Sequence, residues 1–138
     1  MKLPWRTFRQ PNSQREYLAL MSYLPLSSFL SFPLFVWYAL RVTRQLRRTP
    51  GLIAYSLEAK LLSREFWTLS AWESEELLQA FVKRFPHTAA MHWMAPRMGE
   101  TFFTRYVVTG ADLPLSWMEA HRREQMTRSV SQGLWSVR

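Results

Sequence analysis

The sequence predicts an α+β fold, in which strands and helices form one domain of 138 residues. Three observations predict it. Apolar and polar residues alternate over 52–59, which is typical of a strand. An aromatic, strand-like run at 66–72 leads into an amphipathic helix, and the uncharged segment 17–40 divides into a strand and a helix. A chain of this length is sufficient to bury a single core.

The chain is expected to begin with an arm over residues 1–16, which are polar and basic and include two prolines. Trp5 and Phe8 are its expected anchors on the domain, and no apolar run in it is long enough for a cleavable signal peptide. The domain itself is expected to span residues 17–125. Residues 126–138 are rich in Ser and Arg, and we expect a flexible tail there.

Residues 17–40 carry no charge and are long enough to cross a bilayer, for which about 20 apolar residues suffice. Pro25, Pro33 and several serines would interrupt such a span. A membrane-anchored protein with a single span over Leu18–Leu40 therefore stands as an alternative. We favour the division of residues 17–40 into two elements of a globular domain.

The first of these elements is a strand at 17–24, and the second is a helix that begins after Ser31 with Pro33 in its first turn. Arginines follow in the C-terminal half of the helix, where cations suit the helix dipole. One stripe of the helix is mostly apolar: Phe32, Phe35, Val36, Ala39, Thr43 and Leu46. A membrane-spanning helix is apolar on all sides, whereas an apolar stripe with the 3.6-residue period is typical of a helix that packs one face on a core. The pattern therefore favours the second kind of helix.

A hairpin of two strands and a second helix follow. The period of two places alternate residues of the first strand on one face: Ile53, Tyr55, Leu57 and Ala59. The second strand, 66–72, is rich in aromatic residues, as expected for a strand buried on both faces. Ser74 is the expected N-cap of the helix, with Glu75 and Glu76 in its first turn and Pro86 after its end.

The remaining elements are a short helix at 87–94, a strand at 101–109 and a helix at 115–125. The order is the βαββαβ pattern of a ferredoxin-like fold, which has a four-stranded antiparallel sheet with helices on one face. The other face would be bare, and it is too aromatic to be exposed to water. We therefore expect a second copy to cover it, which predicts a homodimer.

The formal net charge of +8 comes mainly from arginines that are dispersed along the chain. A basic balance by itself is compatible with nucleic acid, anionic lipid or an anionic small molecule. The sequence carries no RNA-binding signature, so we expect no nucleic-acid partner. Cysteine is absent, which excludes disulfides and thiolate chemistry.

Two stretches resemble a known superfamily: PGLIAYSL at 50–57 and FWTLSAWESEELLQAFVKRFPHTAAM at 66–91. A glycine opens the second strand, an aromatic third strand ends at Trp72 before an acidic helix cap, and a Pro-His pair follows a Leu/Phe helix. The pattern is similar to the dimeric α/β-barrel superfamily, which includes the antibiotic-biosynthesis monooxygenases, related monooxygenase-like bacterial proteins and the heme-degrading monooxygenases. The resemblance covers about residues 17–109.

The resemblance implies oxygen insertion without a flavin or a dedicated metal, hence no resident cofactor. Such chemistry needs a base near neutrality, aromatic walls and a donor for an oxyanion. His87, in the Pro-His pair, is the candidate base. The candidate substrate-binding residues are Tyr23, Tyr55 and Trp67 as pocket walls and Arg97 or Arg105 as oxyanion donors. The alternative is a core role for Tyr55 and Trp67 and a surface or capping role for His87.

The heme-degrading branch implies a second possibility, with heme bound by His92 or His87. That branch has an axial histidine after the second helix and an aromatic residue, usually Trp, within it. This chain has Phe81 in the helix, and His92 stands about one residue from the expected position. His87 and His92 are five residues apart and do not share a helix face, so we expect no two-histidine metal site. His121, beside two arginines, is expected to be solvated.

The resulting hypothesis is a cytoplasmic homodimer with no membrane partner. It would act as a cofactor-independent monooxygenase on an aromatic or polyketide-like molecule, held in a hydrophobic pocket between sheet and helices. The alternative is a module of the same fold that binds a hydrophobic ligand or heme without oxidising it. Replacement of His87 separates the two, because an enzyme would lose turnover and keep affinity.

Overall fold

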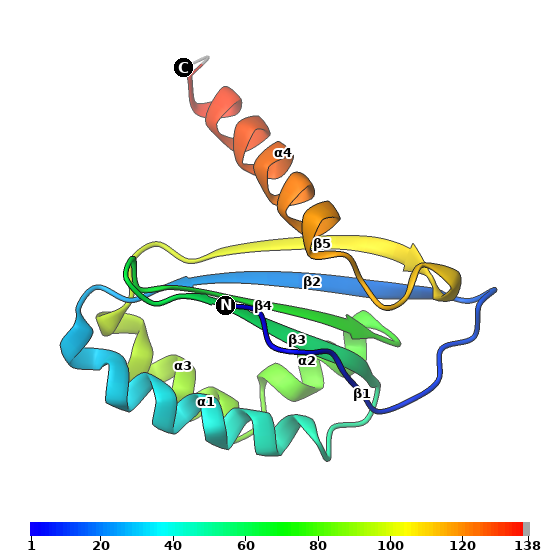
Figure 1. The fold of residues 1–138 in the computed structure, drawn as a ribbon, viewed down its shortest axis with the longest axis horizontal. Helices are drawn as coiled ribbons and strands as arrows, with labels where there is room; N and C mark the ends of the chain where they lie inside the picture. The colour runs from blue at the N-terminus through cyan, green and yellow to red at the C-terminus, as the bar shows by residue number, and fades with distance from the viewer. Residues whose placement is uncertain (137–138) are drawn as a thin grey trace.

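A five-stranded antiparallel sheet forms the centre of the protein (Figure 1). The structure is a computed structural model that describes the backbone of residues 1–136 and the side chains of residues 1–130. The strands are β1 (Arg6–Thr7), β2 (Glu16–Pro25), β3 (Leu52–Lys60), β4 (Glu65–Trp72) and β5 (Phe102–Thr109). The helices are α1 (Phe32–Leu46), α2 (Glu75–Val82), α3 (His87–Met94) and α4 (Trp117–Ser136), with 3-10 turns at Phe29–Ser31, Ala95–Arg97 and Gly110–Asp112.

The sheet has the order β1-β3-β4-β2-β5, and α1, α2 and α3 lie on one side of it while α4 lies on the other (Figure 1). Without β1, this is the order of a ferredoxin-like βαββαβ sheet, so the predicted ferredoxin-like α+β fold is confirmed. The prediction of helices on one face only is wrong, because α4 packs on the other face. The prediction of four strands is wrong, because the N-terminal arm supplies a fifth. The arm pairs along β3, where the backbone N–H groups of Leu3 and Phe8 donate to Leu57 and Ile53, each at 2.8 Å.

The arm covers an edge that would otherwise present unpaired backbone groups to other chains. Both expected anchors make contact. Trp5 packs against the buried residues of the sheet, and the ring of Phe8 stacks on Tyr55 with centroids 5.9 Å apart. The arm is thus a strand of the sheet rather than a loose cover.

The uncharged segment is divided as expected, with β2 in its first half and α1 after the 3-10 turn. No helix in the described part of the chain is both long and apolar enough to cross a membrane. The alternative of one helical span over Leu18–Leu40 is wrong, because β2 and α1 divide this segment. Pro25 ends β2, and α1 has 15 residues, fewer than the roughly 20 that a bilayer requires.

A β-bulge interrupts the pairing of β3 with β4 between Leu52 and Ala54. Leu52 therefore packs with Tyr55 on the helix side, and Ile53 packs on the opposite side. The expected placement of Ile53 with Tyr55 is wrong for this reason, since a bulge inserts one extra residue. Gly51 precedes the bulge with φ of +87°, and a Cβ on it would lie 2.5 Å from Cδ1 of Leu77. Only glycine fits both constraints.

Helix α2 begins as predicted, because the Ser74 hydroxyl accepts a hydrogen bond from the backbone N–H of Leu77 at 3.2 Å. The expected cap of α1 is different. Ser31 makes no side-chain cap, and Ser28 instead caps the preceding 3-10 turn by accepting from the N–H of Leu30 at 3.1 Å. The turn separates β2 from α1 and sets where the helix starts.

Buried residues form two clusters, one on each face of the sheet. The helix-side cluster contains Leu52, Tyr55, Trp72, Leu78 and Phe81. The other cluster contains residues of β2, β3, β4 and β5 together with Leu115, Trp117 and Ala120 from the α4 region. Both faces of the sheet are therefore covered, at least in part, by the same chain.

Helix α4 occupies the face that a second copy was expected to cover. Trp117 and Ala120 are 8% and 0% exposed, and with Glu124 they recur at helical spacing on one side of α4. The apolar part of this side ends at Ala120, polar residues continue the contact with the sheet as far as Arg128, and the C-terminal end of the helix projects away from the sheet (Figure 1). The argument for a homodimer from a bare face is thus removed, and a homodimer remains a proposal.

The helix also continues past residue 125 to Ser136, where a flexible tail was expected. Side-chain hydroxyls within this part bond to the preceding turn, as Thr127 does to the carbonyl of Arg123 at 2.8 Å. Residues 137–138 of the expected tail lie outside the described residues.

Candidate functional site

His87 is the first residue of α3 and lies in the helix layer. Its ring packs on Phe81, with centroids 4.9 Å apart, and its backbone N–H donates to the side-chain oxygen of Gln45 at 3.1 Å. Gln45 also donates its amide to the carbonyl of Phe81 at 3.2 Å. Three helices therefore fix the position of this histidine: α1 through Gln45, α2 through Phe81 and α3 through its own backbone.

The imidazole of His87 is held neutral. Burial lowers its pKa below the ordinary value of 6.5, although the hydrogen bond to the Val82 carbonyl acts in the opposite direction. That bond joins Nδ1 to the carbonyl oxygen at 3.1 Å. Because a carbonyl can only accept, Nδ1 carries the proton and Nε2 keeps the basic lone pair. His87 thus has the protonation state and the tautomer of a general base.

Aromatic rings continue from His87 to the sheet. Phe81 lies 5.3 Å from Trp72 between ring centroids, and Tyr55 belongs to the same buried cluster. Tyr55 is 6% exposed and Trp72 is 1% exposed. Both residues belong to the core. Tyr55 could therefore support the residues that line a site, but it would not contact a ligand itself.

The other predicted site residues do not converge on His87. Arg105 lies on β5 and forms an ion pair with Glu75 of α2. Arg97 follows α3, and its guanidinium donates to the carbonyl of Trp93. Each arginine is thus already engaged by the protein, and neither is aimed at the histidine by any interaction that the structure shows.

Tyr23 and Trp67 lie on the opposite face of the sheet, beneath α4. Their rings are 5.2 Å apart, so they are the one pair of predicted wall residues that the structure brings together. The Tyr23 hydroxyl donates to Glu65 at 2.7 Å. Burial and this bond raise the pKa of Tyr23 to about 12, which keeps the phenol protonated at neutral pH.

A second group of polar side chains lies under α4, and the sequence did not predict it. Nε2 of His121 donates to a carboxylate oxygen of Glu58 at 2.7 Å, and its Nδ1 lies 3.6 Å from Glu124. Trp67 donates its indole N–H to Glu124 at 3.2 Å. Expected solvation of His121 is therefore wrong, because the ring is held between two buried carboxylates and packs edge-on against Trp67.

One signal in the sequence could have indicated this group. Trp117, His121, Glu124 and Arg128 recur at intervals of four, three and four, which places them on one side of a helix. Arg128 completes the group, since it lies 3.5 Å from Glu124 and its guanidinium stacks 4.5 Å from the Tyr23 ring centroid. These contacts attach α4 to the sheet.

A small depression of about 180 Å³ lies between α4 and β5. Thr104 and Tyr106 line it from the sheet, and their buried hydroxyls have no hydrogen-bond partner. Burial raises the pKa of Tyr106, so its hydroxyl remains a donor. Arg123 lies over the Tyr106 ring at 4.5 Å. A bound acceptor group would satisfy the two hydroxyls.

The residues present do not fit a heme in the helix layer. His92 is exposed on α3, and its ring is edge-on to Trp93 with centroids 5.3 Å apart. Buried side chains fill the space between α2 and the sheet, where Leu78 and Phe81 are packed. No group of three or more His, Asp or Glu side chains within residues 1–130 is arranged to hold a metal ion.

The lowered pKa of His87 predicts a specific pH dependence of stability. Below pH 6.5 the unfolded histidine binds a proton that the folded one resists, so stability falls as the pH drops through the folded-state pKa. We expect His87→Gln to flatten this part of the profile. The measurement is the urea unfolding free energy of both proteins between pH 7.5 and pH 5. Identical slopes in the two proteins would show that His87 does not titrate in this way.

No protein-family model matches the sequence, and no curated protein matches it either. Solved structures do match it in fold. SnoaB from Streptomyces nogalater, a cofactor-independent oxygenase, has a TM-score of 0.56 and 9% identity, over 71% of this chain and 97% of that one. A dimeric ferredoxin-like protein from Thermobifida fusca has a TM-score of 0.58 and 14% identity, over 70% and 95%.

A proposed monooxygenase from Lactobacillus acidophilus has a TM-score of 0.59 and 7% identity over 73% of this chain. The present chain spans half the length of that protein. The chain has the fold of the antibiotic-biosynthesis-monooxygenase-like proteins. At these identities the likeness shows only the fold. Any reaction of this protein has to be argued from its own side chains.

Proposed function

We propose that the protein is a monooxygenase-like enzyme that acts on a hydrophobic aromatic or polyketide-like molecule without a resident cofactor, with His87 as its base. One observation carries the proposal. His87 is neutral and fixed in the tautomer that leaves Nε2 basic, at the edge of an aromatic layer. The likeness in fold to a cofactor-independent oxygenase supports the same reaction class.

The reaction would start with removal of a proton from an acidic phenol or enol of the substrate by Nε2 of His87. The resulting anion is electron-rich enough to reduce oxygen. One oxygen atom would end in the product as a carbonyl, and the other would leave as water. His87 is only partly buried, so a substrate can reach it at the edge of the helix layer, with Phe81 beside the ring.

The test is oxygen uptake with a panel of multi-ring phenols. We expect His87→Gln to reduce turnover by about 10²–10⁴-fold, the usual contribution of a general base, with little change in substrate affinity. His92→Gln is the matched control, since His92 is exposed on the same helix and makes no contact with His87 that the structure shows.

A protein that binds these phenols but takes up no oxygen would contradict the proposal. So would equal turnover in the wild type and the His87→Gln variant. The pH profile adds a further check, because a base with a lowered pKa keeps activity below pH 6.5, and the rate should fall only as His87 becomes protonated.

A second candidate function is binding of a small molecule without oxidation. The unpartnered hydroxyls of Thr104 and Tyr106 favour it, because they line the depression beside α4. Its volume suits a fragment about the size of one ring, below the roughly 300 Å³ of most ligand sites. Tyr106→Phe would weaken such binding and leave phenol oxidation at His87 unchanged.

A further inference from the structure

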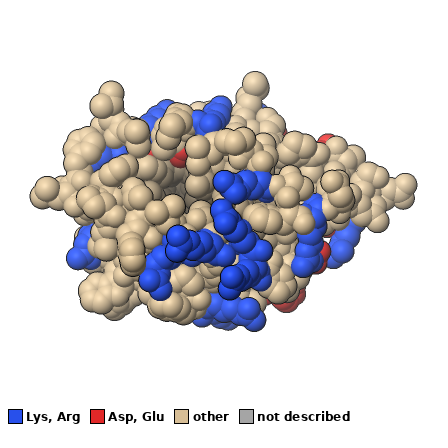
Figure 2. Space-filling view, turned by 60° about the horizontal axis from the view of Figure 1, so that its bottom comes forward, with Lys and Arg blue, Asp and Glu red and all other residues tan. Residues whose placement is uncertain are grey.

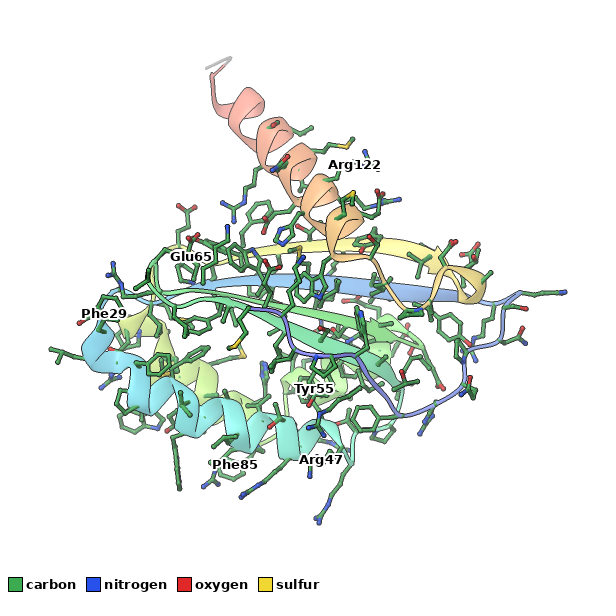
Figure 3. The ribbon with its side chains drawn as sticks, in the orientation of Figure 1. Phe29, Arg47, Tyr55, Glu65, Phe85 and Arg122 are labelled. Carbon is green, nitrogen blue, oxygen red and sulfur yellow. The ribbon has the colours of Figure 1, made fainter. Side chains whose placement is uncertain are left out.

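The outward side of α1 is apolar where a helix exposed to water is normally polar. Val36, Trp37 and Leu40 are spaced for one face of the helix, and Trp37 and Leu40 are 56% and 55% exposed. The preceding turn adds Phe29 and Leu30, of which Leu30 is 91% exposed. Large apolar side chains are thus presented to solvent along α1, which lies in the helix layer below the sheet (Figure 1), and Phe29 is seen at the start of this helix (Figure 3).

Basic residues continue the same side of the helix. Arg44, Arg47 and Arg48 are exposed in and just after the last turn of α1. Figure 2 shows Lys and Arg side chains gathered in the middle of this face. No Asp or Glu occurs anywhere in residues 17–57, so no acidic side chain of α1 neutralises the arginines.

The turn between α2 and α3 extends this surface. Phe85 is 67% exposed, and the guanidinium of Arg41 lies over both its ring, at 5.4 Å, and that of Trp37, at 5.6 Å. Lys83 and Arg84 are exposed beside Phe85, and residues 77–99 also contain no Asp or Glu. We call the exposed residues of the 3-10 turn before α1, of α1 itself with Arg47 and Arg48 after it, and of the α2–α3 turn the α1 patch.

We propose that the α1 patch binds peripherally to an anionic membrane surface. Trp, Phe and Leu side chains enter the interface between headgroups and acyl chains, and arginines beside them attract anionic headgroups. The patch has both features on one surface, with the apolar residues toward the N-terminal end of α1 and the arginines toward its C-terminal end. The expectation of no membrane partner considered only a spanning segment, and α1 would lie on the membrane without crossing it.

The charge of the α1 patch argues against a second copy as its occupant. In a symmetric dimer through this surface both copies would bring arginines and neither would bring a carboxylate, so the positive charge of the interface would have no partner. Nucleic acid would suit the arginines but not the aliphatic side chains of Leu30, Val36 and Leu40, which have no ring on which a base could stack. An anionic lipid surface accommodates both the arginines, at its headgroups, and the aliphatic side chains, among its acyl chains.

The experiment is flotation of the full-length protein with vesicles of phosphatidylcholine alone or of equal parts phosphatidylcholine and phosphatidylglycerol. We expect binding to the anionic vesicles, little binding to the neutral ones, and partial release by salt. The double variant Trp37→Ser with Leu40→Ser and the triple variant Arg44→Gln, Arg47→Gln, Arg48→Gln should each reduce the apparent affinity by tenfold or more. Because the assay needs no turnover, its result is independent of the proposed function.

The matched controls are Met118→Ser and Arg122→Gln, two exposed residues of α4, which lies on the other side of the sheet (Figure 1); Arg122 is labelled in Figure 3. Both variants should leave binding unchanged. Urea unfolding would confirm that all variants are folded. Absence of binding to the anionic vesicles would overturn the proposal, as would equal binding by the α1-patch variants. A change of oligomeric state in the variants without vesicle binding, or preferential binding to an oligonucleotide, would also overturn it.

Discussion

Replacement of Trp117 by alanine is expected to lower the unfolding free energy by about 3–5 kcal/mol, the usual cost of removing a buried Trp. Trp117 is the first residue of α4, is largely buried, and packs in the cluster that includes Tyr106 and Ala120. Its indole N–H donates to the hydroxyl of Ser56 on β3 at 3.2 Å. The variant loses both the packing and the hydrogen bond that hold the start of α4 on the sheet. Urea unfolding at neutral pH measures the difference.

The control for this prediction is Met118→Ala. Met118 is the next residue of α4 and is 83% exposed, so its removal should change the unfolding free energy little. Trp117→Phe should fall between the two, because it keeps an aromatic ring and loses the indole N–H. If Trp117→Ala were no less stable than Met118→Ala, the attachment of α4 to the sheet would be wrong.

Local signals in the sequence were sufficient to predict the βαββαβ core. Ser74 caps α2 because its hydroxyl and the following acidic residues act within one turn. Pro25 is the last residue of β2, and Pro86 stands between α2 and α3 as the N-cap of α3. Each of these effects depends on residues close in sequence, so it is visible without a structure.

The N-terminal arm and α4 could not be predicted in the same way. Whether Arg6 pairs with Tyr55 depends on which edge of the sheet is open, and that is known only after the other strands are placed. Helix α4 has a narrow contact side, with Trp117 and Ala120 followed by the polar His121 and Glu124. A pattern search for apolar residues therefore misses where the helix packs.

The candidate site was predicted only in part for a geometric reason. The connection between β3 and β4 sets Glu58 opposite Trp67, and Glu58 is three positions after Tyr55 along β3, an odd number. Because neighbouring residues in a strand face opposite sides, Tyr55 and Trp67 cannot line the same pocket. This register follows from the hairpin and could have been derived from the sequence. The state of His87 could not, because it depends on the Val82 carbonyl and on burial by other helices.

Removal of the buried carboxylate of Glu124 is the second change with a large expected effect. Glu124 is 7% exposed and accepts from Trp67, while His121 and Arg128 lie beside it. In Glu124→Ala the indole N–H of Trp67 loses its acceptor in a buried region and Arg128 loses its carboxylate, while His121 keeps Glu58. We expect a loss of about 2–3 kcal/mol, because the variant leaves the buried indole N–H of Trp67 unpaired and removes the packing of the Glu124 side chain.

Two variants on the same helix make this prediction specific. Glu124→Gln keeps an acceptor for Trp67 and loses only the charge, so its stability should lie between that of Glu124→Ala and the wild type. Glu119→Ala removes a carboxylate that pairs with Arg122 and Arg123 at the exposed side of α4, and surface pairs contribute little. Urea unfolding of the three variants should therefore rank Glu119→Ala as the most stable and Glu124→Ala as the least. Equal effects at the two positions would mean that Glu124 is solvated, and that the polar group under α4 does not attach the helix.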